Sequence, residues 1–132
     1  MALDVVELRA FYETALGEVA RRVVGRLLRA RWDDHVGLRV LGMGYAPPYL
    51  DNFREKAQRV LAFMPATQGV MHWPLDGRSA TALVEASMTP LPDASMDRIL
   101  LVHALEVEEH PQDLLDEVWR ILAPGGRVVI VA

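Results

Sequence analysis

The sequence predicts an α/β fold, with a parallel β-sheet covered by helices on both faces. Short apolar runs of strand length alternate along the chain with amphipathic segments of helical periodicity, the pattern of right-handed β-α-β units. The run RILLVHAL at 98–105 is apolar without interruption, as in a strand buried on both faces of a parallel sheet. The sequence APGG at 123–126 then separates an amphipathic helix from a last apolar strand. Sheets of this kind bind ligands beyond the carboxyl ends of their strands.

The N-terminal segment, residues 4–31, is predicted to be helical. Its apolar residues recur every three or four positions and would form one stripe: Val5, Leu8, Tyr12, Leu16, Val19, Val23 and Leu27. Gly17 and Gly25 weaken the pattern, so a break near either glycine is plausible. The arginines of RRVVGRLLRARW alternate with apolar residues at helical spacing, which favours a solvated helix face over an anion-binding patch.

The rest of the chain divides into alternating strands and helices. Strands are predicted at residues 38–43, 59–65, 81–87, 98–105 and 127–132. A helix is predicted at 48–58, where Pro48 suits a first turn, and another at 110–122. The second helix would face inward through Leu114, Leu115, Val118, Ile121 and Leu122. Residues 66–80 are predicted to be a loop with a strand fragment at 69–73, and Gly125 a left-handed cap of the preceding helix.

Composition and charge exclude several classes of protein. At 132 residues, 52% hydrophobic and 24% charged, the chain fits one globular domain. A net charge of -4 gives no reason to expect nucleic acid as a partner. The absence of cysteine excludes disulfides and thiolate metal sites, and His35, His72 and His110 have no partner at metal-ligand spacing, so no metal is expected. No apolar stretch approaches the ~20 residues of a membrane helix, so we expect a cytoplasmic protein without a membrane partner.

Three segments, in this order, resemble the class I S-adenosylmethionine-dependent methyltransferases, of the methyltransferase type 11-like kind. VLGMGYA is a strand and glycine turn. PLPDASMDRILLVHALE is similar to the family's LPFPDxSFDxVxxxxxLEH, and LLDEVWRILAPGGRVVIV is similar to its LLxExxRVLxPGGxLxI. The resemblance implies a Rossmann-like sheet of strand order 3-2-1-4-5, S-adenosylmethionine as cofactor, and methyl transfer to an acceptor that the residues do not identify.

The resemblance also implies a glycine turn that holds the amino-acid end of the cofactor. Gly44 matches the family's first glycine, and Gly42 stands where the family usually has an acid. Ala46 and Pro48 replace the next two glycines, which gives a stiffer loop with fewer backbone donors. Tyr45 would help to enclose the cofactor, although it could equally be a surface aromatic residue.

Four further residues complete the cofactor site that the resemblance implies. Met64 ends the second strand, where the family has an acid for the ribose. Ser87 aligns with the aspartate that reads adenine, and Met88 with the residue whose N–H meets the ring. His103, after the fourth strand, would line the methyl-transfer pocket or be an ordinary histidine near a strand end. No catalytic residue is predicted, because methyl transfer depends mostly on positioning and desolvation.

The resemblance further bears on the organisation of the chain. Family members usually continue past the fifth strand, so residues 35–132 are expected to be a core without the C-terminal strands, and residues 1–34 an N-terminal helical extension. The chain would then be a fragment or a shortened member of the family. The apolar edge of its last strand carries little charge, and we expect a second copy or the N-terminal helix to cover it.

Two functions remain open. The first is an S-adenosylmethionine-dependent methyltransferase, and the second is a non-catalytic methyltransferase-like binding or assembly module with weak or no cofactor affinity. The second is favoured by the residues that replace the family's usual ones, among them Ala46, Met64, Ser87 and Val107. A nicotinamide dehydrogenase is disfavoured, because the glycine spacing differs and no acid follows.

Overall fold

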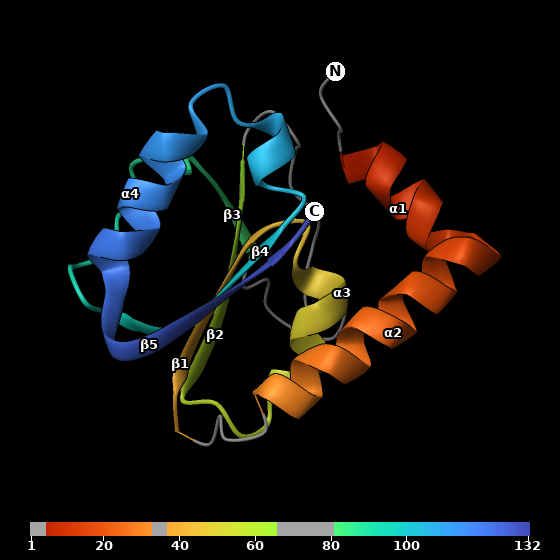
Figure 1. Cartoon of the computed structure of the whole chain (residues 1–132), viewed down its shortest axis with the longest axis horizontal. Helices are drawn as coiled ribbons and strands as arrows, with labels where there is room; N and C mark the ends of the chain where they lie inside the picture. The colour runs from red at the N-terminus through yellow and green to blue at the C-terminus, as the bar shows by residue number, and fades with distance from the viewer. Residues whose placement is uncertain (1–4, 33–36, 66–80) are drawn as a thin grey trace.

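The fold is a single parallel sheet of five strands in the order β3-β2-β1-β4-β5 (Figure 1). The computed structural model describes residues 5–32, 37–65 and 81–132, and the predicted strand fragment at 69–73 lies outside them. The strands are β1 (Arg39–Gly44), β2 (Arg59–Pro65), β3 (Thr81–Val84), β4 (Met96–Val102) and β5 (Leu122–Val131). Every pairing is parallel, and the order of the strands is the predicted one.

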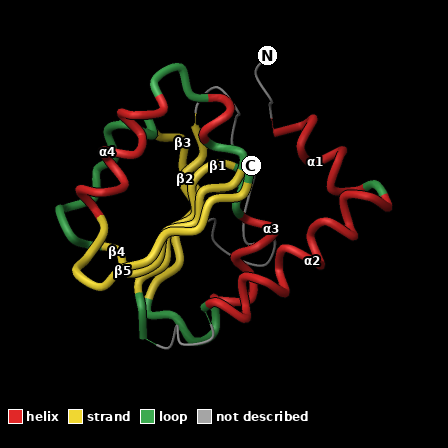
Figure 2. Tube along the Cα trace, viewed as in Figure 1, coloured by secondary structure: helices red, strands yellow, loops and turns green. Residues whose placement is uncertain are grey.

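Helices cover both faces of the sheet, as predicted. Helix α4 (Pro111–Ile121) lies on one side, and α1 (Val5–Glu13), α2 (Ala15–Arg31) and α3 (Pro47–Leu50) lie on the other (Figure 2). Successive strand residues point to opposite faces, so β1 contributes to both layers of the core. Leu41 packs in the cluster on the α4 side, and Val40 packs in the cluster that includes Tyr49 of α3.

The N-terminal segment is two helices, broken at Thr14. The Thr14 hydroxyl caps α2 by accepting a hydrogen bond from the Gly17 N–H at 3.0 Å. A Cβ at position 17 would lie 2.0 Å from the Phe11 carbonyl oxygen, so only glycine lets the first turn of α2 meet the end of α1 this closely. The break expected near Gly17 or Gly25 therefore occurs near Gly17.

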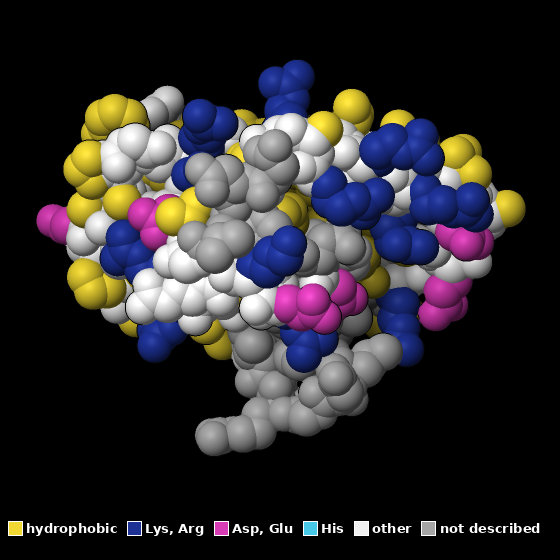
Figure 3. All heavy atoms as spheres, turned by 90° about the horizontal axis from the view of Figure 1, so that it is seen from below, with side chains coloured by type: hydrophobic (Ala, Val, Ile, Leu, Met, Phe, Trp, Pro, Cys, Tyr) yellow, Lys and Arg dark blue, Asp and Glu magenta, His cyan; other side chains and the backbone are white. Residues whose placement is uncertain are grey.

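The apolar stripe predicted for α2 is wrong. Four of its residues are more than half exposed: Leu16, Val19, Val23 and Leu27. The helix instead buries Gly17, Gly25 and Leu28, on a face turned by about a third of a turn, and Gly17 allows the close approach to the end of α1. The arginines of this segment are exposed as predicted, and Figure 3 shows Lys and Arg side chains gathered where α2 lies.

Several predicted boundaries also differ. The helix expected at 48–58 is only α3 followed by one 3-10 turn, η1 (Asp51–Phe53), because its apolar anchors end at Phe53 and a polar turn precedes β2. β3 ends at Val84 rather than at residue 87. β4 runs from Met96 to Val102, and the chain then leaves the sheet for a short turn, η2 (Leu105–Val107).

Gly125 adopts the left-handed conformation, with φ of 77°, but it does not cap the helix. Helix α4 ends at Ile121 and continues directly into β5, where the register shifts between the pairs Met96–Leu122 and Arg98–Arg127. Gly125 thus lies in an irregular part of β5 that re-aims the strand. The inward placement of Leu115 was wrong, since Leu115 is 37% exposed, whereas Leu122 packs against the core on the α4 side but belongs to β5.

Helix α4 buries a carboxylate, Glu117, that the apolar pattern did not reveal. Glu117 accepts hydrogen bonds from the Thr89 N–H and hydroxyl and from the Arg120 guanidinium, and Arg120 also pairs with Asp93 at 2.7 Å. These contacts fasten the link between β3 and β4 to α4. The hydrogen bonds from Arg120, and then those from Thr89, lower the pKa of Glu117 from 4.5 to about 2.

A second carboxylate joins the amino ends of the two central strands. Asp97 at the start of β4 accepts hydrogen bonds from the Arg39 backbone N–H at 2.9 Å and from the Arg39 guanidinium at 3.0 and 3.2 Å. The guanidinium contact holds the pKa of Asp97 below its usual range. The amino ends of β1 and β4 are therefore fixed by charge as well as by the sheet.

We predict that Glu117→Gln lowers the free energy of unfolding by about 2 kcal/mol at neutral pH, because it removes charge-assisted hydrogen bonds from a buried site. The folded-state pKa is depressed, so the contribution of Glu117 is complete above pH 4.5 and is lost as the pH falls toward about 2. Urea titrations of both proteins across this range should therefore converge at low pH. Asp116→Asn, exposed on the same helix, is the matched control and should change little.

Alanine substitutions at the two glycines of α2 should change the free energy of unfolding in opposite directions. Gly17→Ala forces a Cβ against the Phe11 carbonyl, and we expect it to lower the free energy of unfolding by about 1–3 kcal/mol. Gly25→Ala meets nothing closer than the Arg29 guanidinium at 3.6 Å, so its better helix propensity should raise stability by about 0.5–1 kcal/mol. Urea denaturation measures both. Equal effects of the two substitutions would contradict the packing described for Gly17.

Candidate functional site

The carboxyl ends of β1 and β4 meet at Gly44. Gly44 pairs with Val102, and the Tyr45 N–H donates to the Val102 carbonyl at 2.8 Å. Gly44 has φ of 82°, and a Cβ there would lie 2.2 Å from the Val102 oxygen and 3.0 Å from the Cβ of Ala104. Glycine is therefore required at position 44 by the contact between two strand ends, independently of any ligand.

Glycine is required at position 42 for a similar reason, a close contact within the protein. A Cβ at this position would lie 2.5 Å from the Cβ of Ala46 and 2.7 Å from Leu50 Cδ1. The absence of a side chain allows α3 to pack directly on β1. The spacing of Gly42 and Gly44 thus reflects packing within the protein as well as the shape of a cofactor turn.

A chain of hydrogen bonds lies beside this turn and links four side chains. His103 follows β4, and its Nδ1 lies 3.0 Å from Glu106 Oε2 while its Nε2 lies 3.0 Å from the Tyr12 hydroxyl. The Tyr49 hydroxyl donates to the Tyr12 oxygen at 2.9 Å. A carboxylate can only accept, so neutral His103 carries its proton on Nδ1 and accepts from Tyr12 through Nε2. Each hydrogen bond of this chain is thus donated in the same direction, from Tyr49 to Tyr12, then to His103 and then to Glu106.

His103 holds this position in an unfavourable backbone conformation. Its φ is 51°, in the left-handed region that residues with a Cβ rarely adopt. Such a conformation costs about 1–3 kcal/mol and is found where the surrounding structure requires it, often at functional sites. The turn it creates directs the imidazole toward the α1 side, where Tyr12 lies.

Tyr12 packs against two other tyrosines. The Tyr12 ring stacks on Tyr45 with centroids 5.5 Å apart and planes at 16°, and it meets Tyr49 edge-on at 5.9 Å. Tyr45 and Tyr49 are buried, so Tyr45 is not a surface residue. Burial is the main cause that raises the pKa of each of the three phenols. At neutral pH they are hydrogen-bond donors rather than anions.

The residues predicted for the cofactor site are only partly brought together. Gly44, Tyr45 and His103 meet at the ends of β1 and β4. Met64 is fully buried in the same cluster as Tyr45. Ser87 and Met88 follow β3, and the Met88 N–H already donates to the Glu85 carbonyl at 3.0 Å.

Sequence reasoning missed the partners of His103. Tyr12 was included in an apolar stripe, and Tyr49 and Glu106 were given no role. The available signal was the phenol itself, because a tyrosine on the inner face of a helix needs a partner for its hydroxyl. The identity of that partner could not be read from the sequence, since Tyr12 and His103 are 91 positions apart.

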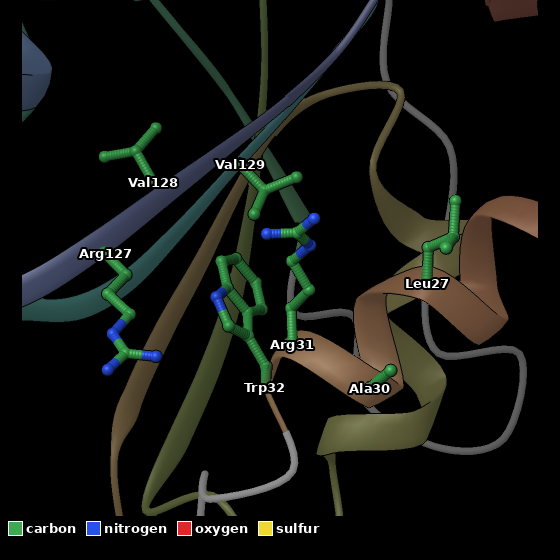
Figure 4. Close-up of a pocket in the computed structure, with 7 residues that line it drawn as sticks. All are labelled: Leu27, Ala30, Arg31, Trp32, Arg127, Val128 and Val129. Atoms are coloured by element: carbon green, nitrogen blue, oxygen red, sulfur yellow. The ribbon is translucent and has the colours of Figure 1, made fainter.

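Other kinds of site were sought in the part of the chain that the structure describes. No group of three or more acidic, histidine or cysteine side chains there could hold a metal ion. None of the described helices is long and apolar enough to cross a bilayer. A groove of about 720 Å³ runs between the end of α2 and β5, lined by Trp32, Arg31 and Val129 among others (Figure 4). It contains none of the predicted cofactor residues.

Comparison with known proteins identifies the fold and the family. The family model of the methyltransferase domain matches residues 24–130. A demethylmenaquinone methyltransferase of Thermus thermophilus is 30% identical over 95 residues, which are 72% of this chain and 36% of the relative. The chain therefore spans about a third of that protein.

Two solved structures share the fold. The [4+2]-cyclase SpnF superposes with a TM-score of 0.69 at 22% identity, over 89% of this chain and 47% of its own. A putative S-adenosyl-L-methionine-dependent methyltransferase of Methanococcus maripaludis superposes with a TM-score of 0.67 at 15% identity, over 96% and 63% of the two chains. The match to the family model covers most of the sheet, and this chain belongs to the methyltransferase domain family.

Proposed function

We propose that this chain is the cofactor-binding part of an S-adenosylmethionine-dependent methyltransferase, with the cofactor beyond the carboxyl ends of β1 to β4. The observation that carries the proposal is the family match over residues 24–130, together with the Gly44 turn at the strand ends. When bound, the cofactor supplies a methyl group activated by its sulfonium sulfur. The acceptor is left open by this argument, and a cytoplasmic location is part of the proposal.

The described residues fit the cofactor in part. The turn at Gly44 and Tyr45 would hold its amino-acid end, the half-buried Ser87 hydroxyl and the Met88 backbone would meet adenine, and Met64 would form an apolar wall. His103 would lie near the transferred methyl group. No carboxylate stands at the end of β2 among the described residues to bind the ribose. Each missing charged contact weakens binding by about 1.5–3 kcal/mol.

A second candidate, a non-catalytic binding module, is favoured by one specific observation. Gly42 and Gly44 are explained by contacts inside the protein, so their presence does not require a bound cofactor. Tyr12 also contacts His103 and Tyr45, where the methyl-transfer pocket is proposed. Under this candidate the chain keeps the fold and has lost the ligand.

We further propose that a second copy of the chain pairs with the β5 edge. Among the described strands β5 pairs with β4 alone, and its Ile130 is 48% exposed. The neighbouring groove presents the apolar Leu27 of α2 and Val129 of β5 (Figure 4). Arg127 is the one charged residue of β5, and an edge with so little charge is a template for strand addition, so two β5 strands related by a twofold axis would extend the sheet.

Calorimetry with S-adenosylmethionine and S-adenosylhomocysteine tests the cofactor proposal. We expect dissociation constants of about 10 µM to 1 mM, because some polar contacts of a micromolar site are missing. Ser87→Ala should weaken binding about 2–10-fold through loss of one hydrogen bond. Ser95→Ala is the matched control, since Ser95 lies at the opposite, amino edge of the sheet and its buried hydroxyl has no hydrogen-bond partner. Absence of heat at about 1 mM ligand with folded protein would favour the binding module.

Light scattering after gel filtration tests the β5 contact. We expect the chain to be a dimer at about 100 µM, and Ile130→Lys to be a monomer because an edge charge opposes strand pairing. Val6→Lys is the control, since it places the same charge at a residue of α1 that is 71% exposed. A wild-type chain that stays monomeric at this concentration contradicts the proposal.

A further inference from the structure

We propose that Tyr12 occupies the position of the methyl acceptor, and that the acceptor is a phenolic compound whose hydroxyl binds to His103. This inference rests on the proposed function and extends it to the substrate class and to a catalytic residue. The structure places a phenolic hydroxyl 3.0 Å from His103 Nε2, with its ring stacked on Tyr45. The phenol of Tyr12 thus shows which chemical group the contacts with His103 and Tyr45 can bind.

The surroundings of the Tyr12 ring are those of an aromatic binding site. Tyr45 supplies a flat face at 5.5 Å, Tyr49 supplies an edge and a hydroxyl donor to the phenol oxygen, and His103 supplies the acceptor for the phenol proton. A phenol in this position has both its O–H and its oxygen lone pair satisfied. A hydrocarbon ring of the same shape could neither donate to His103 Nε2 nor accept from the Tyr49 hydroxyl, which gives specificity for the hydroxyl group.

Tyr12 is held in a way that an acceptor could replace. Helix α1 buries only Leu8, and its Val6 and Phe11 are exposed. The helix is joined to α2 at the Thr14 break, and Leu8 anchors it in the core cluster that contains Tyr45, Tyr49 and Val102. A phenolic ligand that takes over the contacts with Tyr45, Tyr49 and His103 therefore needs to displace the Tyr12 side chain, while Leu8 keeps α1 on the core.

The same contacts assign the proton in the transfer step. The acceptor O–H bond breaks, its proton passes to His103 Nε2, and the oxygen electron pair forms the new O–C bond while the C–S bond electrons return to sulfur. The imidazolium that forms is stabilised by the Glu106 carboxylate, 3.0 Å from Nδ1. His103 is the catalytic base, and Glu106 is a positioning residue that fixes the proton on Nδ1.

Binding of p-cresol, which reproduces the tyrosine side chain, to Tyr12→Ala tests the inference without any cofactor. We expect p-cresol to bind this variant at least tenfold more tightly than toluene, and to shift the imidazole nitrogen resonances of His103 in 15N-labelled protein. Tyr12→Phe should bind p-cresol at least tenfold more weakly than Tyr12→Ala, because its ring still fills the site. If Tyr12→Ala does not fold, Tyr12→Val replaces it in the same measurements, with a smaller opening because the valine side chain is larger than that of alanine.

Two further variants separate recognition by His103 from simple filling of a cavity. In the Tyr12→Ala background, His103→Asn keeps a residue that tolerates the left-handed conformation and should reduce the preference for p-cresol over toluene to the part that the Tyr49 hydroxyl provides. Glu106→Ala should increase the Nε2-protonated tautomer in the nitrogen spectrum, whereas Glu109→Ala, at an exposed neighbour, should not.

Equal binding of p-cresol and toluene, or p-cresol binding without a change at His103, would overturn the inference. These results do not depend on S-adenosylmethionine. A chain that binds the cofactor but shows no preference for the phenol disproves only the acceptor class, and a chain that prefers the phenol but binds no cofactor disproves only the proposed function.

Discussion

The contact between the carboxyl ends of β1 and β4 is the constraint on which the rest of the site depends. Gly44 touches the Val102 carbonyl and Ala104, and no side chain fits between them. This closeness lets the chain turn into α3 on one strand and into the His103 turn on the other. The tyrosines and the imidazole therefore converge from elements that are far apart in the sequence. A wider spacing of the two strands would separate Tyr45 from the turn that carries His103.

Two of the family's sequence motifs occur together because their residues bind one another on the α4 side of the sheet. Glu117 and Arg120 of the helix motif bind Thr89 and Asp93 of the segment before β4. Asp97, at the end of that segment, binds Arg39 at the start of β1. The charged residues of these motifs are thus structural connections between α4, the β3–β4 link and the central strands.

The parallel sheet and its two helical layers could be predicted, because alternating apolar runs are local signals, and the strand order followed from the resemblance to the methyltransferase family. The buried face of α2 could not, since the close contact of Gly17 with Phe11 is a packing feature that apolar periodicity does not register. In the site, Gly44 and His103 were identified by their positions after strands. Tyr12 and Glu106 were not, because their roles come from hydrogen bonds to His103 that only the folded chain brings together.

The family match begins at residue 24, whereas Tyr12 lies on α1, before that boundary. The phenol that contacts His103 is therefore supplied by a segment outside the residues that match the family model. In the proposed acceptor site, a substitution at position 12 would change the contact with His103 and leave every residue of the sheet and of the strand-end turn as it is. Selectivity for the acceptor and the fold of the sheet would then be specified by separate stretches of the chain.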